Sequence, residues 1–142
     1  MALILDASAT LAWFVQRTDA DEAALADEIV STVERDEATV PTIWYVEVVN
    51  GLLVAERSRL SDPSKSSRFL GELAALPIIE DRVGASSVQS EVLAIGRRYG
   101  LTAYDSVYLE LSLRTGGALA TFDRQLADAL RKAGGRVFGD AA

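Results

Sequence analysis

Four acidic residues have the placement expected of a metal site, because each interrupts or ends an apolar segment: Asp6, Glu47, Asp105 and Asp123. The segments are LILD, IWYVEVVNGLLVA, LTAYDSVYLEL and LATFD, in chain order. Carboxylates that converge repel one another, and a divalent cation removes that repulsion. The chain has no histidine or cysteine, so all-oxygen ligation favours Mg²⁺ or Mn²⁺ over Zn²⁺. Such a site would assist the hydrolysis of phosphodiester bonds.

Asp6 and Asp123 each follow a predicted strand, and each also has a simpler explanation. Asp6 could begin the helix predicted from Ala9, a role for which Ser8 is equally suited. Asp123 could cap the helix that begins at Arg124. Ligands of parallel sheets bind beyond the carboxyl ends of the strands, so two acids at strand ends favour a shared site over two unrelated caps.

Asp105 lies in the first turn of a helix predicted over residues 102–114. Thr102 and Asp105 have the spacing of a capping box, which would by itself explain the acid. Apolar residues continue along this helix at helical spacing: Tyr104, Val107, Tyr108 and Leu111. We therefore expect the helix to be buried on most sides and Asp105 to emerge in a crevice rather than in open water.

Glu47 is the acid that is hardest to explain as ordinary surface. In the helix predicted over residues 41–59, Glu47 and Asn50 are neighbours on one face, and the surrounding segment is apolar. The simpler alternative is a narrow solvent-facing stripe that continues to Ser58. Because buried charges are paired or bind metals, we favour the interpretation that Glu47 faces a cation and Asn50 orients a neighbour.

The elements that must position these residues alternate along the chain, which predicts an α/β fold with a mainly parallel sheet. Strands are predicted over residues 2–5, 39–40, 77–79, 118–121 and 136–138. Helices are predicted over residues 9–16, 21–34, 41–59, 62–75, 84–99, 102–114 and 124–132. The length of 142 residues predicts a single domain, residues 1–142.

The net charge of −7 is concentrated in residues 19–37, which hold eight acids and one base, whereas residues 38–142 hold as many bases as acids. Net negative charge opposes nucleic-acid binding, but this distribution leaves a neutral region that could face a polyanion. The missing histidine and cysteine exclude Ser-His-Asp catalysis and disulfides. The sequence has no signal-peptide pattern and no apolar run of about 18 residues, so we expect a cytoplasmic protein without a membrane span.

Four segments, LDAS, PTIWYVEVVNGL, LTAYDSVYLELS and LATFDRQL, resemble in order and spacing the signature blocks of PIN-domain ribonucleases. The resemblance covers nearly the whole chain and is greatest to the VapC-type toxins of toxin–antitoxin pairs. The acidic quartet of that family falls on Asp6, Glu47, Asp105 and Asp123. Its accessory polar positions fall on Ser8, Asn50 and Thr121. Val107 and Ser112 depart from the family pattern at positions without a ligand role.

This resemblance implies a PIN-like three-layer sandwich, with a central, mainly parallel sheet between helices. It implies a Mg²⁺- or Mn²⁺-dependent endoribonuclease in which water attacks a phosphodiester bond. Asp6 and Asp105 would be direct metal ligands, and Glu47 and Asp123 would complete the shell directly or through water. It also implies a cognate VapB-type antitoxin, and either a toxin homodimer or a toxin–antitoxin hetero-oligomer.

Basic and aromatic residues give weaker signals. Candidate contacts to RNA phosphates are Arg97, Arg98, Arg124, Arg131 and Lys132, although for each one taken singly a solvated surface position is the better explanation. Trp13, Phe14, Trp44 and Tyr45 could line a groove for an antitoxin helix. Aromatic residues at helical spacing are more often core, and we favour that interpretation.

The main alternative function is a magnesium-binding phosphoacceptor domain, since receiver-type α/β domains also hold an acidic site at strand ends. Those domains normally have an adjacent acidic pair at the first strand, where this chain has Asp6 alone. They also use a late lysine, and the chain offers Lys65 and Lys132 only. A dehalogenase-like phosphatase is disfavoured because Asp6-Ala7-Ser8 lacks a second aspartate.

Overall fold

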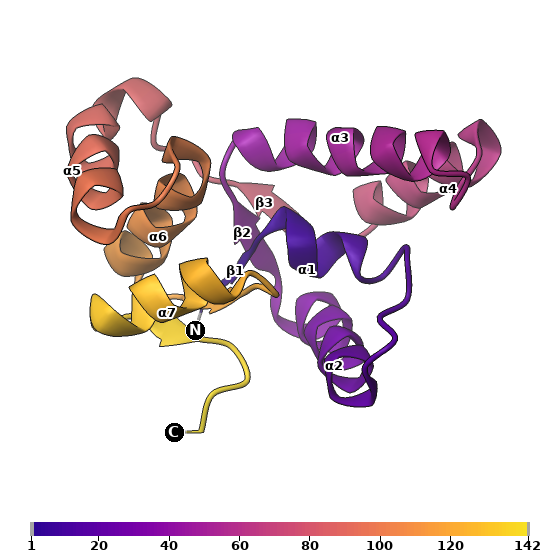
Figure 1. Cartoon of the computed structure of the whole chain (residues 1–142), viewed down its shortest axis with the longest axis horizontal. Helices are drawn as coiled ribbons and strands as arrows, with labels where there is room; N and C mark the ends of the chain where they lie inside the picture. The colour runs from indigo at the N-terminus through magenta and orange to yellow at the C-terminus, as the bar shows by residue number, and fades with distance from the viewer. Residues whose placement is uncertain (1, 142) are drawn as a thin grey trace.

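The computed structural model describes residues 2–141, which form a five-stranded sheet with helices on both faces (Figure 1). The strand order is β3-β2-β1-β4-β5, and every pairing is parallel. The strands are β1 (Leu3–Leu5), β2 (Ala38–Val40), β3 (Ile78–Glu80), β4 (Ala118–Ala120) and β5 (Arg136–Val137). The predicted α/β sandwich is therefore confirmed.

The helices agree with the predicted number, and two of them differ most from their predicted extent. They are α1 (Ala7–Leu11), α2 (Ala20–Asp36), α3 (Ile43–Arg57), α4 (Pro63–Ala74), α5 (Gln89–Tyr99), α6 (Ala103–Thr115) and α7 (Arg124–Lys132). The predicted helix 9–16 begins earlier and is shorter, because Asp6 rather than Ser8 caps it and turns follow Leu11. The predicted helix 84–99 begins at Gln89, because a separate 3₁₀ turn occupies Ala85–Ser87.

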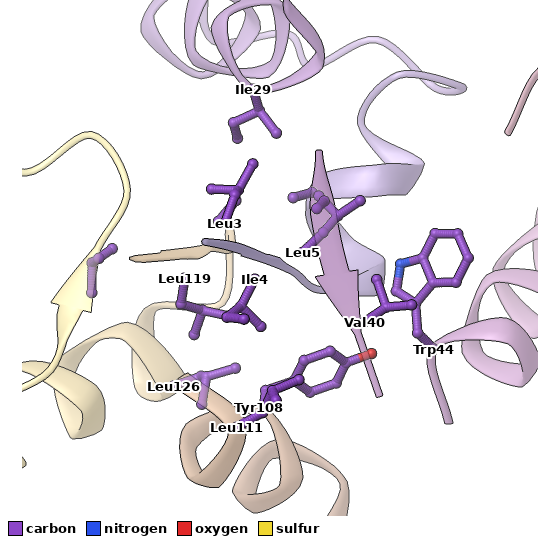
Figure 2. Close-up of a cluster of buried hydrophobic side chains, with 14 of the residues drawn as sticks. Leu3, Ile4, Leu5, Ile29, Val40, Trp44, Tyr108, Leu111, Leu119 and Leu126 are labelled. Carbon is purple, nitrogen blue, oxygen red and sulfur yellow. The ribbon is translucent and has the colours of Figure 1, made fainter. Parts of the chain in front are cut away.

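The central strand β1 is buried on both faces, which explains its continuous apolar run. Figure 2 shows Leu3 directed toward Ile29 of α2, while Ile4 lies on the opposite side with Tyr108 and Leu126 of α6 and α7. Pairing of β1 with β4 sets Leu5 opposite Ala120. Both strands end there, so the residues that follow, Asp6 and Thr121, come to the same edge of the sheet.

Close approach of β1 and β4 depends on Gly117, which immediately precedes β4. A Cβ atom at this position would lie 2.7 Å from the Ala2 carbonyl oxygen and 3.1 Å from Ile4 Cγ1. We expect Gly117→Ala to destabilise the protein by about 1–3 kcal/mol, because the backbone must shift to relieve the clash. Urea unfolding measures this, with Gly71→Ala in α4 as the control.

At Gly71 an added Cβ meets nothing within 4 Å, and alanine in a helix interior is favoured over glycine by roughly 0.5–1 kcal/mol. The two glycine variants should therefore move the urea midpoint in opposite directions. An unchanged or higher midpoint for Gly117→Ala would show that β1 and β4 tolerate a wider spacing.

Helices α3 and α6 are more exposed than the sequence predicted. On α3 the exposed apolar residues are Tyr45, Val46, Val49, Leu53 and Val54, so Glu47 and Asn50 do not form the sole solvent-facing stripe. On α6, Tyr104 is 60% exposed, although it was expected in the buried stripe with Tyr108. The predicted core position of Trp44 is correct, whereas Tyr45 lies mostly outside the core.

Trp13 and Phe14 are half-buried and pack against the core, as the core interpretation of the aromatic residues requires. The Trp13 indole N–H also donates to the Ala26 carbonyl oxygen of α2, at 3.1 Å. No helix within residues 2–141 combines the length and the apolar character that crossing a membrane demands.

Candidate active site

Asp6 is the most constrained of the predicted site residues, and it caps α1. Its Oδ1 accepts hydrogen bonds from the Ala9 N–H at 2.9 Å and the Ser8 hydroxyl at 2.7 Å. Its Oδ2 accepts a hydrogen bond from the Thr121 hydroxyl. A carboxylate offers about four acceptor positions, so these three bonds leave room for one further ligand.

The predicted accessory residues Ser8 and Thr121 connect the ends of β1 and β4. Ser8 Oγ accepts a hydrogen bond from the Phe122 N–H, and Thr121 Oγ1 accepts one from the Asp123 N–H, each at 3.0 Å. The two hydroxyls that hold the Asp6 carboxylate are thus themselves fixed by the backbone that leads to Asp123. Hydrogen bonds therefore fix the side chains of Asp6, Ser8 and Thr121 at this edge of the sheet.

Burial raises the pKa of Asp6 to about 6, from an ordinary value of 3.8. The hydrogen bonds from Thr121, Ala9 and Ser8 act in the opposite direction, and the charge of Glu47 raises the pKa slightly further. With only 5% of its surface exposed, Asp6 is a buried acid without a neighbouring positive side chain among its hydrogen-bond partners. This is the environment in which a cation would stabilise a carboxylate most.

Glu47 projects from the middle of α3 and is half-buried. The Tyr108 hydroxyl on α6 donates a hydrogen bond to Glu47 Oε1 at 2.5 Å. Burial raises the pKa of Glu47, the hydrogen bond from Tyr108 lowers it, and the charge of Asp105 raises it. Asn50 lies one helical turn further along α3 and is exposed, so its orienting role stays a prediction.

Asp105 and Asp123 both occupy helix starts, and both are half-buried. The Asp105 N–H donates to the Thr102 hydroxyl at 3.2 Å, as the predicted capping arrangement requires. Asp123 caps α7, with its Oδ1 accepting from the Leu126 N–H at 3.1 Å. Burial, followed by the charge of Asp123, raises the pKa of Asp105.

The four acids form a chain of electrostatic neighbours, in which Asp6 is influenced by Glu47, Glu47 by Asp105, and Asp105 by Asp123. In the part of the chain that the structure describes, no three acidic side chains lie close enough as placed to hold a metal ion together. The donor set of carboxylates and hydroxyls fits a hard cation such as Mg²⁺. The four-carboxylate metal site therefore stays a prediction, supported by the electrostatics.

The predicted phosphate contacts differ in their availability. Arg124 is exposed and lines a surface hollow beside Asp123, together with Thr121 and Phe122. Acids from the start of α2 also line that hollow. Arg97 and Arg98 are exposed in the last turn of α5.

Arg131 is the least available of these bases. Its guanidinium pairs with Asp128 at 2.9 Å and with Asp140 at 2.8 Å. The pair with Asp140 links α7 to the C-terminal segment. Lys132, at the end of α7, is exposed.

Sequence reasoning missed two buried polar features of α6. Glu110 on α6 is only 8% exposed and pairs with Arg114, which also binds Asp81 beyond β3. The i,i+4 spacing of Glu110 and Arg114 was the available signal. The second feature is the Tyr108–Glu47 hydrogen bond, for which the sequence offers no signal because 61 residues separate the partners.

A parallel sheet with acids at adjacent strand ends and at the start of α6 describes a known class of fold. Residues 3–132 match the model of the PIN domain, so the chain belongs to the PIN domain family. Ribonuclease VapC3 of Pyrobaculum aerophilum is 30% identical over 128 residues, which cover 90% of this chain and 94% of the relative. The predicted resemblance to VapC-type members is thereby confirmed.

A solved structure agrees with this assignment. The crystal structure of PAE2754 from Pyrobaculum aerophilum superimposes with a TM-score of 0.66 and is 26% identical in sequence. The match covers 91% of this chain and 79% of that one.

Proposed function

We propose that this chain is a Mg²⁺- or Mn²⁺-dependent endoribonuclease toxin of the VapC type that acts in the cytoplasm. The observation that supports this most directly is Asp6, a buried acid at the sheet edge whose three hydrogen-bond donors are uncharged and whose pKa the nearby charge of Glu47 raises further. Such an arrangement calls for a cation. PIN-domain nucleases generally use divalent metal ions, and the relative VapC3 is named a ribonuclease.

In this proposal Asp6 and Asp105 bind the cation directly, and Glu47 and Asp123 complete its shell directly or through water. When bound, the ion would lower the pKa of water and stabilise charge on the attacked phosphate. Ser8 and Thr121 orient the Asp6 carboxylate through the hydrogen bonds described above. Asn50 is proposed to orient a neighbour of Glu47.

Substrate RNA would approach along the exposed bases of α5 and α7. The side chain of Gln125 donates to the Gly100 carbonyl oxygen at 3.2 Å, which joins the start of α7 to the loop after α5. Arg97, Arg98 and Arg124 therefore flank one region, and Asp105 and Asp123 begin the helices within it. We propose these three arginines as phosphate contacts.

A cognate VapB-type antitoxin is the proposed inhibitory partner, and the assembly is proposed to be a toxin homodimer or a toxin–antitoxin hetero-oligomer. The exposed apolar residues on α3, among them Val46, Val49 and Leu53, offer a surface of the kind that partners cover. Size measurements with and without the antitoxin would distinguish these assemblies.

The direct test is cleavage of total cellular RNA by the purified protein with Mg²⁺ or Mn²⁺ and with EDTA. We expect discrete internal cuts with either metal and none with EDTA, because the carboxylates alone supply no electrophile to the phosphate. Cleavage that persists in EDTA would contradict the metal dependence.

Metal binding should also be visible without RNA. An ion that binds only the folded state raises Tm by mass action, by an amount that grows with its concentration. Millimolar Mn²⁺ should therefore raise Tm, and coincident melting curves with and without Mn²⁺ would contradict tight binding at the carboxylates.

A further inference from the structure

Tyr108 is a buried residue whose side chain contacts one of the four acids, Glu47. It is only 2% exposed, and its hydroxyl donates the 2.5 Å hydrogen bond to Glu47 Oε1. Figure 2 shows its ring among the core side chains, with the hydroxyl directed away from Leu111, toward the side of Val40 and Trp44. The hydroxyl thus joins α6 to α3 from inside the protein.

The hydroxyl also lies near the start of α1, since the charge of Asp6 is among the causes that raise the pKa of Tyr108. Asp105 lies one turn before Tyr108 on α6. The Tyr108 hydroxyl therefore connects α6, on which Asp105 lies, with Glu47 on α3.

Glu47 needs such a contact more than the other three acids do. Asp6, Asp105 and Asp123 have short side chains at helix starts, and the backbone fixes two of them directly through the Ala9 and Leu126 N–H groups. Glu47 has a longer side chain in the middle of a helix, with more rotatable bonds to immobilise. Its one hydrogen-bond partner among the contacts described is Tyr108.

We propose that Tyr108 is a positioning residue that holds the Glu47 carboxylate in the orientation required for cation binding. This inference rests on the proposed metal-dependent function. Tyr108 acts through Glu47 and touches neither substrate nor cation.

The test is Tyr108→Phe, which keeps the buried ring and removes the hydroxyl. We expect its affinity for Mn²⁺, measured by electron paramagnetic resonance titration, to fall about 10- to 100-fold, as is typical when a partner of a metal ligand is removed. The kcat for RNA should fall with it and KM should change little. Tyr104→Phe, on the exposed face of α6, is the matched control and should leave the Mn²⁺ affinity and the kcat unchanged.

A double-mutant cycle with Glu47→Ala separates positioning from general destabilisation. In the Glu47→Ala background, Tyr108→Phe should cause less than about a twofold further loss of Mn²⁺ affinity, because the residue through which it acts is gone. Equal losses in both backgrounds, or an unchanged affinity in Tyr108→Phe alone, would overturn the inference.

Thermal unfolding of the same four proteins in EDTA tests the contact between Tyr108 and Glu47 in the absence of metal. Tyr108→Phe should lower Tm in the wild-type background and not in Glu47→Ala. Wild-type protein that binds no Mn²⁺ would overturn the proposed function, and the positioning role with it. Wild-type protein that binds Mn²⁺ as tightly as Tyr108→Phe would overturn the positioning role alone.

Discussion

Replacing Asp6 by asparagine should reduce metal-dependent RNA cleavage by roughly a thousandfold or more while leaving the fold intact. Asparagine retains an oxygen that can accept the Ala9 N–H bond, so the start of α1 is preserved. The lost carboxylate charge removes several kcal/mol of stabilisation by the cation, and each 1.36 kcal/mol corresponds to a tenfold change in rate. The measurement is single-turnover cleavage at saturating Mg²⁺.

Asp62→Asn provides a matched control for this variant. Asp62 caps α4 through the same kind of bond, with its Oδ1 accepting from the Lys65 N–H at 2.9 Å, and it is exposed. Asp62→Asn therefore makes the same chemical change at a position outside the four acids. The cleavage rate of this variant should equal that of the wild type. A wild-type rate in Asp6→Asn would contradict the assignment of the active site.

The same substitution should stabilise the protein at neutral pH in EDTA. The folded-state pKa of Asp6, about 6, lies above its ordinary value of 3.8. The folded state therefore binds protons more tightly than the unfolded state, and stability falls as the pH rises through the interval between these values. A shift of about 2 units corresponds to an order of 3 kcal/mol at pH 7 and above.

Asp6→Asn removes this ionisation, so its unfolding free energy should exceed that of the wild type at pH 8 and approach it near pH 4. Urea unfolding at several pH values measures the difference, and Asp62→Asn again supplies the comparison. A constant difference between pH 4 and pH 8 would mean that Asp6 ionises in the fold as easily as in the unfolded chain. Saturating Mn²⁺ should reverse the order, because only the wild type binds it well.

The helices and strands were predictable where a single spacing of apolar residues dominated the segment. The run Leu3–Leu5 predicts a strand buried on both faces, and the structure places it at the centre of the sheet. The start of α5 was not predictable, because Val88 precedes it without a capping side chain and residues 85–87 turn separately. The exposure of α3 was mispredicted because apolar composition does not reveal which face remains uncovered.

The sequence predicts the site as a set of residues but does not predict its geometry. For Asp6 the sequence posed a choice between a helix cap and a site residue; the structure confirms the cap, and the role in the site stays a prediction. One carboxylate oxygen receives the Ala9 N–H, while the other is held by Thr121, 115 residues away. Contacts across such separations, like that of Tyr108 with Glu47, depend on the tertiary fold and leave no local pattern.

Three of the four acids lie at the starts of helices: Asp6 before α1, Asp105 in α6 and Asp123 before α7. The N-terminal end of a helix carries partial positive charge. Each of these carboxylates is therefore partly compensated by the backbone that presents it, before any ion arrives. As a result, the helix starts offset part of the repulsion among these acids in the apoprotein, so less of that repulsion is left for a cation to offset.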